Sequence, residues 1–63
     1  MRTWKNIIIR GLETHDKLKT YLQLTRFKFD ISYISDGDYY FSVLCDDYEC
    51  AIINQWIDNN LNL

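Results

Sequence analysis

The chain has 63 residues, and a chain of this length buries only about 60% of its unfolded surface, so it cannot be divided into two cores. A hydrophobic content of 48% and an aromatic content of 16% favour a packed core and exclude a disordered tail. The net charge of −2 is mild, and two Cys are too few for the disulfide framework of a small secreted protein. We therefore predict one domain spanning residues 1–63.

Residues 5–10 (KNIIIR) form a short run rich in β-branched side chains that stops at Gly11, and this pattern predicts the first strand. Thr14 then offers a helix N-cap, with Asp16 in the first turn. Apolar residues continue at helical spacing and predict a helix over residues 15–25 that covers the sheet. The expected stripe consists of Leu18, Tyr21, Leu22 and Thr25.

From residue 27 to residue 35 the apolar period changes to two, which indicates a strand with one solvated face near the edge of a sheet. Residues 39–45 are the most continuously apolar segment and predict a central strand. Asp46 and Glu49 have the spacing of a capping box, which opens a second helix. The apolar stripe of that helix is Ile52, Ile53, Trp56, Ile57 and Leu61.

The element order βαββα predicts an α+β two-layer sandwich. A right-handed crossover places the first two strands parallel, with room between them. The following hairpin returns the third strand into that gap, so the sheet order is 1-3-2 and both helices cover one face. The arrangement is similar to a ferredoxin-like fold that lacks its last strand, a resemblance that implies architecture only.

The turn at Asp36-Gly37 decides which face receives the aromatic residues of the third strand. A two-residue loop would place Tyr33 opposite Tyr40 and turn Phe41 outward. A three-residue loop that includes Ser35 would place Tyr33 opposite Tyr39 and turn Phe41 and Val43 inward, with Gly37 in the left-handed region. We predict the three-residue loop, because burying Phe41 and Val43 stabilises the fold by about 1.5–3 kcal/mol each.

With that register the helix-free face of the sheet carries more apolar side chains than solvation requires, and such surfaces often mark association. Strand 1 should expose Trp4, Asn6, Ile8 and Arg10, strand 2 Lys28, Asp30, Ser32 and Ile34, and strand 3 Tyr40, Ser42 and Leu44. The predicted partner-binding residues are Trp4, Ile8, Arg10, Ile34, Tyr40 and Leu44. Tyr39 and Phe41 should belong to the core.

The sequence predicts no catalytic residue, no cofactor and no metal site. Cys45 and Cys50 are expected to be buried free thiols, because two thiolates with a distant His15 rarely form a structural zinc site. His15 itself is expected to face solvent, without a nucleophile or a cleft nearby. A two-layer protein of this size has little volume for a substrate pocket, so we expect no enzyme activity.

The N-terminus lacks the layout of a signal peptide, and the longest apolar run, residues 7–9, is far below the roughly 20 residues of a membrane span. We therefore expect a cytoplasmic protein with no membrane partner. The basic residues lie in the first half of the chain, whereas every charge after Ser35 is acidic. We expect these charges mainly to solvate exposed surfaces.

The chain contains no Pro and one Ala, and Ile, Asn, Lys, Tyr and Asp are abundant. In this composition it resembles the small accessory proteins of AT-rich bacteriophages, which implies a host-modulating inhibitor. The first hypothesis is a protein-binding module that uses the open sheet face or the edge of strand 1, which could also pair with a second copy as a homodimer.

The alternative hypothesis is an acidic mimic of nucleic acid that blocks a DNA- or RNA-binding protein. Its acidic surface would consist of Asp36, Asp38, Asp46, Asp47 and Glu49. Topology places these residues at two ends of the sheet, so the mimic would need a dimer to align them. Direct nucleic-acid binding is not expected, because RNP motifs are missing and the net charge is negative.

Overall fold

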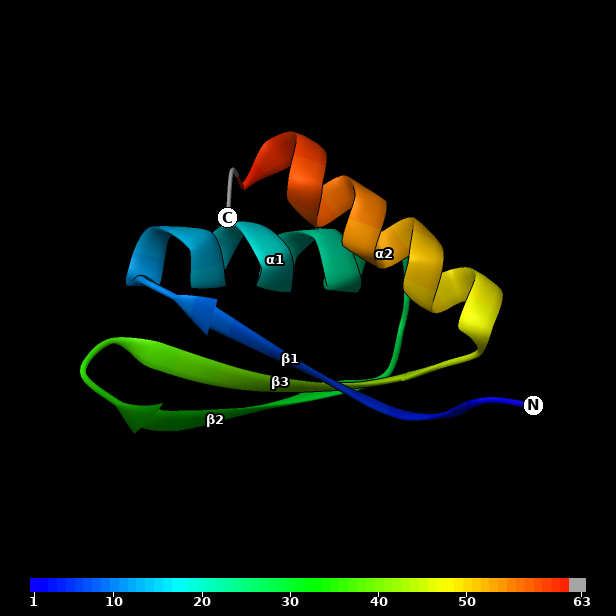
Figure 1. Ribbon diagram of the computed structural model, residues 1–63, viewed down its shortest axis with the longest axis horizontal. Helices are drawn as coiled ribbons and strands as arrows, with labels where there is room; N and C mark the ends of the chain where they lie inside the picture. The colour runs from blue at the N-terminus through cyan, green and yellow to red at the C-terminus, as the bar shows by residue number, and fades with distance from the viewer. Residues whose placement is uncertain (62–63) are drawn as a thin grey trace.

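A computed structural model describes residues 1–61, except the side chain of Ser35. It contains a three-stranded antiparallel sheet of order β1-β3-β2 with both helices on one face, which confirms the predicted fold class (Figure 1). The elements are β1 (Thr3–Arg10), α1 (Leu12–Leu24), β2 (Phe29–Ser35), β3 (Asp38–Cys45) and α2 (Asp47–Asn60). Within this part of the chain, neither helix has the length and apolarity that crossing a membrane requires.

One hydrophobic core fills the space between the sheet and the helices. Its buried members are Ile9, Leu18, Leu22, Phe41, Val43, Cys45, Ile53, Ile57 and Leu61. Both predicted helical stripes contribute to it, although Ile52 is exposed and its neighbour Ile53 is buried. The central strand β3 contributes every second residue from Phe41 to Cys45, as a strand with one buried face should.

Helix α1 begins earlier than predicted, and Thr14 is not its N-cap. The N-cap is Gly11, whose φ of 94° and ψ of 144° are available almost only to glycine. This conformation turns the chain directly from β1 into the helix, and the Gly11 carbonyl accepts a hydrogen bond from the N–H of His15 at 3.0 Å. The Thr14 hydroxyl instead donates to the carbonyls of Arg10 and Gly11.

Helix α2 opens with the predicted capping box. The Asp46 carboxylate accepts a hydrogen bond from the N–H of Glu49 at 2.7 Å, and the Glu49 carboxylate accepts one from the N–H of Asp46 at 3.0 Å. The exchange satisfies two backbone donors that would otherwise lack partners at the helix start.

The predicted faces of the hairpin are correct, but the predicted loop is wrong. Tyr33 pairs with Tyr39 as expected, yet Ser35 pairs with Asp38, so the loop contains only Asp36 and Gly37. Both loop residues have positive φ, as in the type I′ turns that favour Asp-Gly. The extra residue is accommodated by a register shift between Tyr33 and Ser35, a bulge in β2 that gives the same faces as a longer loop.

Tyr33 was expected on the buried face, and it remains 64% exposed. It lies on the helix side of the sheet, but β2 is an edge strand and gives it a neighbouring strand on one side only. Its ring makes an edge contact with Tyr39, with centroids 5.6 Å apart.

The bulge leads to a deletion test. Removing Ile34 should convert the hairpin into a regular one with the same two-residue turn and unchanged faces, because Tyr33 would still pair with Tyr39. We expect the free energy of unfolding to change by about 1 kcal/mol or less, the scale of local strand effects. Urea unfolding followed by circular dichroism measures this change.

Deletion of Ser42 is the matched control. Ser42 lies in β3 and pairs with a residue of each neighbouring strand. A residue missing at this position moves the side chains on one side of the deletion to the opposite face of the sheet. Exposing two core side chains costs about 1.5–3 kcal/mol each, so this variant should unfold. Equal loss of stability in the two deletions would contradict the assignment of the bulge.

Candidate functional site

The open face of the sheet brings four predicted partner-binding residues together as two cross-strand pairs. Trp4 lies opposite Leu44, and Ile8 lies opposite Tyr40. Trp4 and Ile8 are 55% and 61% exposed, whereas the two side chains of the central strand are half-buried. Both helices cover the other face, so these pairs are accessible (Figure 1).

A polar pair separates the two apolar pairs. Asn6 lies opposite Ser42, whose hydroxyl donates a hydrogen bond to Asn6 Oδ1 at 3.2 Å. The open face therefore has an apolar, polar, apolar pattern along β1 and β3.

The structure places the other two predicted residues differently. Arg10 lies at the end of β1 and donates two hydrogen bonds to the Asp38 carboxylate, at 2.9 and 3.2 Å. Ile34 lies within the bulge of β2 and is 48% exposed, but it belongs to neither cross-strand pair. The compact candidate surface, which we call the open-face patch, therefore consists of Trp4, Ile8, Tyr40 and Leu44.

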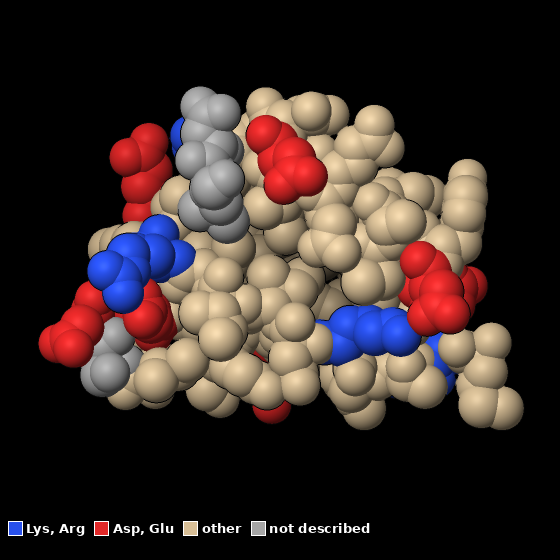
Figure 2. Space-filling model, viewed as in Figure 1, with Lys and Arg blue, Asp and Glu red and all other residues tan. Residues whose placement is uncertain are grey.

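Most of the predicted acidic surface is engaged inside the molecule. Glu49 pairs with Arg2 at 2.7 Å and Asp47 pairs with Lys5 at 2.9 Å. These hydrogen bonds lower the pKa of the Glu49 and Asp47 carboxyls, and they raise the pKa of the two basic groups. These two pairs lie at one end of the molecule, and Figure 2 shows acidic and basic side chains side by side at the other end as well.

The remaining acidic residues do not complete a stripe. Asp38 pairs with Arg10, and Asp46 caps α2. Asp36 is exposed in the turn, at the hairpin end of the sheet. The acidic groups are divided between the two ends of the sheet, as the topology predicted.

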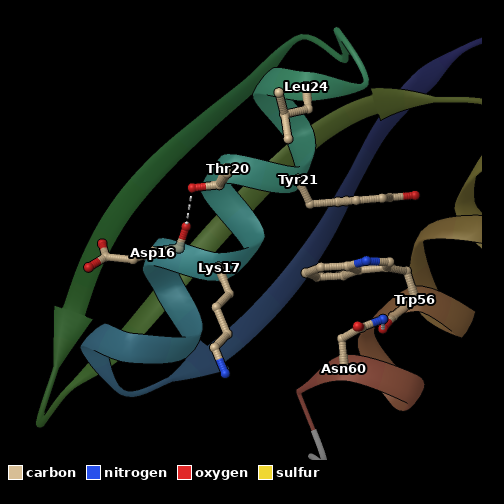
Figure 3. A pocket seen from close by; sticks show the side chains of 7 residues that line it. All are labelled: Asp16, Lys17, Thr20, Tyr21, Leu24, Trp56 and Asn60. Atoms are coloured by element: carbon tan, nitrogen blue, oxygen red, sulfur yellow. Dashed lines mark hydrogen bonds between the residues drawn. The ribbon is translucent and has the colours of Figure 1, made fainter.

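A groove between the two helices is a feature that sequence reasoning missed. It has a volume of about 480 Å³ and is lined by Asp16, Lys17, Thr20, Tyr21, Leu24, Trp56 and Asn60 (Figure 3). The rings of Tyr21 and Trp56 stack with centroids 4.2 Å apart and planes 12° apart. This volume lies in the range of ligand pockets and is larger than we expected.

Two polar side chains of the groove, Thr20 and Asp16, have partners within the molecule. The Thr20 hydroxyl donates to the backbone carbonyl of Asp16 at 2.9 Å, so it is not activated by a base. The Asp16 carboxylate points away from the stacked rings (Figure 3) and lies 2.9 Å from Nδ1 of His15.

His15 does not face solvent, and that prediction was wrong. Its side chain is only 14% exposed and lies against Tyr39 and Phe41, with ring centroids 4.4 and 5.5 Å away. This position lies on the same side of α1 as the buried Leu18 and Leu22. Its spacing of three and seven residues from Leu18 and Leu22 was the signal that could have placed it on the buried face.

The two cysteines are free thiols. Cys45 is buried as expected and Cys50 is half-buried. Burial raises the pKa of the Cys45 thiol, and the neighbouring Cys50 adds to this effect. Among residues 1–61, no three His, Cys, Asp or Glu side chains lie close enough together to hold a metal ion.

No family model, curated protein or solved structure matches this chain. The candidate site therefore rests on the geometry of the open-face patch and of the ion pairs around it.

The pairing of Arg2 with Glu49 predicts an acid-dependent loss of stability. The pKa of Glu49 is lower in the folded chain than its ordinary value of 4.5, so the pair stabilises the fold above that pH. The stabilisation is lost as the pH falls through the lowered pKa. Glu49→Gln keeps the capping geometry but removes the charge, so it should be less stable than the native chain at pH 7.

Urea unfolding across the acid range tests this expectation. The stability difference between the native chain and Glu49→Gln should shrink as Glu49 becomes protonated. In an Arg2→Gln background, Glu49→Gln should cost less, because the partner cation is gone. A difference that stays constant down to full protonation would contradict the role of the pair.

Proposed function

We propose that this chain is a small non-enzymatic protein-binding module, a bacteriophage-type inhibitor that engages a host protein through the open-face patch. The observation that carries the proposal is the exposure of Trp4 and Ile8 beside Leu44 and Tyr40 on the sheet face opposite α1 and α2. Trp and Tyr are enriched among residues that dominate binding energy. The compositional resemblance to bacteriophage accessory proteins supports a bacterial protein as the target.

The charges support a protein partner rather than a nucleic acid. Three basic residues that could contact phosphate, Arg2, Lys5 and Arg10, already form ion pairs with carboxylates of the same chain. With a net charge of −2, the chain also lacks long-range attraction for a polyanion.

The same ion pairs weaken support for an acidic mimic. A mimic presents unneutralised carboxylates to its target, whereas Asp38, Asp47 and Glu49 are paired with basic side chains. An apolar interface also predicts weak salt dependence, and a mimic predicts steep salt dependence.

The test compares partner capture by patch and control variants. The immobilised native chain should retain a specific bacterial protein, and the double variant Trp4→Ala/Tyr40→Ala should bind that protein at least about tenfold more weakly. Removing two exposed or half-buried side chains should leave the circular dichroism spectrum unchanged. Affinity for the captured protein is then measured by calorimetry at low and moderate salt.

Tyr48→Ala is the matched control. Tyr48 is an aromatic residue on α2 that is 76% exposed and lies outside the open-face patch. Its replacement should leave affinity unchanged. Equal weakening by the control, unchanged affinity of the double variant, or a collapse of binding between low and moderate salt would overturn the proposal.

A further inference from the structure

The two edges of the sheet are protected differently. At the β2 edge, the Asp30 carboxylate accepts a hydrogen bond from the N–H of Ile31 at 3.0 Å. The bulge between Tyr33 and Ser35 further interrupts that edge. Bulges and local charges are devices that stop an edge strand from pairing with another chain.

The β1 edge has neither device. Its eight residues pair with β3 without a register shift, from Thr3 to Arg10, so its backbone is an uninterrupted template for another strand. Its charged side chains are engaged by the same chain: Lys5 pairs with Asp47 in α2, and Arg10 pairs with Asp38 in β3. Because these charges are paired within the chain, they do not prevent another strand from pairing with this edge.

Alternation of hydrogen bonds shows which groups of β1 are available. The N–H of Gly11 donates to the carbonyl of Gly37 at 2.8 Å and continues the β1–β3 ladder, so odd-numbered residues of β1 are bonded to β3. The backbone groups of Trp4, Asn6 and Ile8 therefore point away from β3. These residues also carry their side chains on the open face.

We propose that β1 pairs with β1 of a second copy of this chain, antiparallel, with Asn6 opposite Asn6. Opposite residues of antiparallel strands point to the same face, so even-numbered residues must face even-numbered residues. Among such registers, this one places Trp4 opposite Ile8 of the second copy. A shift of two residues would place Trp4 opposite Arg10 or Asn6 instead.

The register extends the pattern already present on the open face. Each apolar pair of one copy continues into an apolar pair of the other, which makes two rows of four side chains that cross the dimer. One row contains Leu44 and Trp4 of one copy followed by Ile8 and Tyr40 of the other. Cross-strand apolar pairs of this kind stabilise a sheet.

The polar centre and the charged ends are also self-complementary. Asn6 Oδ1 accepts from Ser42, so its amide NH₂ is left to donate to Asn6 of the second copy across the two-fold axis. At the ends, Arg10 meets Arg2 of the second copy. Each guanidinium is neutralised by its own carboxylate, Asp38 or Glu49, so the ends do not repel strongly.

The inference goes beyond the proposed function and does not require it. The dimer has a continuous six-stranded sheet with all four helices on one face, and it joins two open-face patches into one surface. A second copy is favoured over a foreign strand because, in one register, the apolar positions of β1 face apolar positions of the second copy, the polar centre faces the polar centre, and the charged ends face charged ends.

The first test measures association. Sedimentation equilibrium of the native chain should reveal a dimer, and Ile8→Lys should weaken dimerisation at least about a hundredfold by placing charges in both apolar rows. The matched control, Leu24→Lys, changes a leucine of α1 that is 78% exposed and should leave dimerisation unchanged. A native chain that remains monomeric at millimolar concentration would overturn the proposal.

The second test determines the register. Under mild oxidation Asn6→Cys should form a disulfide with itself, because opposite residues have Cα atoms about 5.5 Å apart. Trp4→Cys and Ile8→Cys should cross-link when mixed and not alone. The native chain, with Cys45 and Cys50, serves as the background. Cross-linking of Asn6→Cys with Ile8→Cys in place of self-linking would overturn this register.

Hydrogen exchange separates edge pairing from face-to-face packing. At dimer-forming concentrations the amides of Trp4, Asn6 and Ile8 should exchange at least about tenfold more slowly than in dilute solution, whereas Ile7 and Ile9 should change less. Unchanged exchange in a chain that still dimerises would overturn edge pairing.

A dimer that captures no bacterial protein would refute the proposed function alone, and a monomer that captures one would refute the dimer alone.

Discussion

The central strand β3 is the constraint on which the rest of the structure depends. Within residues 1–61 it is the only strand with two neighbours, and it supplies Phe41, Val43 and Cys45 to the core. Side chains of a strand alternate between faces, so the same register that buries these residues directs Tyr40 and Leu44 to the open face. The core and the candidate binding surface are therefore two results of one register.

The ion pairs at the ends of the sheet combine a structural and a functional effect. Arg2 and Lys5 of the N-terminal segment reach the first turn of α2, where Glu49 and Asp47 also suit the helix dipole. These partly exposed pairs are individually weak, but together with the Arg10–Asp38 pair at the hairpin end they neutralise charge at both ends of the sheet. The uncharged middle of β1 is thereby left as the most apolar accessible part of the strand.

The architecture could be predicted because period, capping and topology agreed. The two-residue period located the strands, the Asp46 capping box located the second helix, and the right-handed crossover with the hairpin gave the sheet order. The turn could be predicted only in part, because an extra residue in the loop and an extra residue in a bulge put the same side chains on the same face of the sheet. Counting which residues share a face of the sheet therefore cannot reveal the positive φ of Asp36 or the bulge at Ile34.

The site was predictable to the extent that it follows from strand alternation. Trp4, Ile8, Tyr40 and Leu44 could be assigned to one face by counting. The ion pair between Arg2 and Glu49 joins residues 47 positions apart and depends on the tertiary register, which local patterns do not contain. The Tyr21–Trp56 stack was missed for the same reason, because each ring was assigned to a separate helical stripe.

The order of strands in the sheet also affects how the chain emerges from the ribosome. β1 is synthesised first, yet its nearest pairing residue in β3 lies 28 positions later, as in the pair Arg10–Asp38. At about 5–20 residues per second, seconds pass before β3 follows. During that interval the segment that contains Trp4 and Ile8 has no β3 to pair with, so its apolar side chains stay exposed until the central strand has been made.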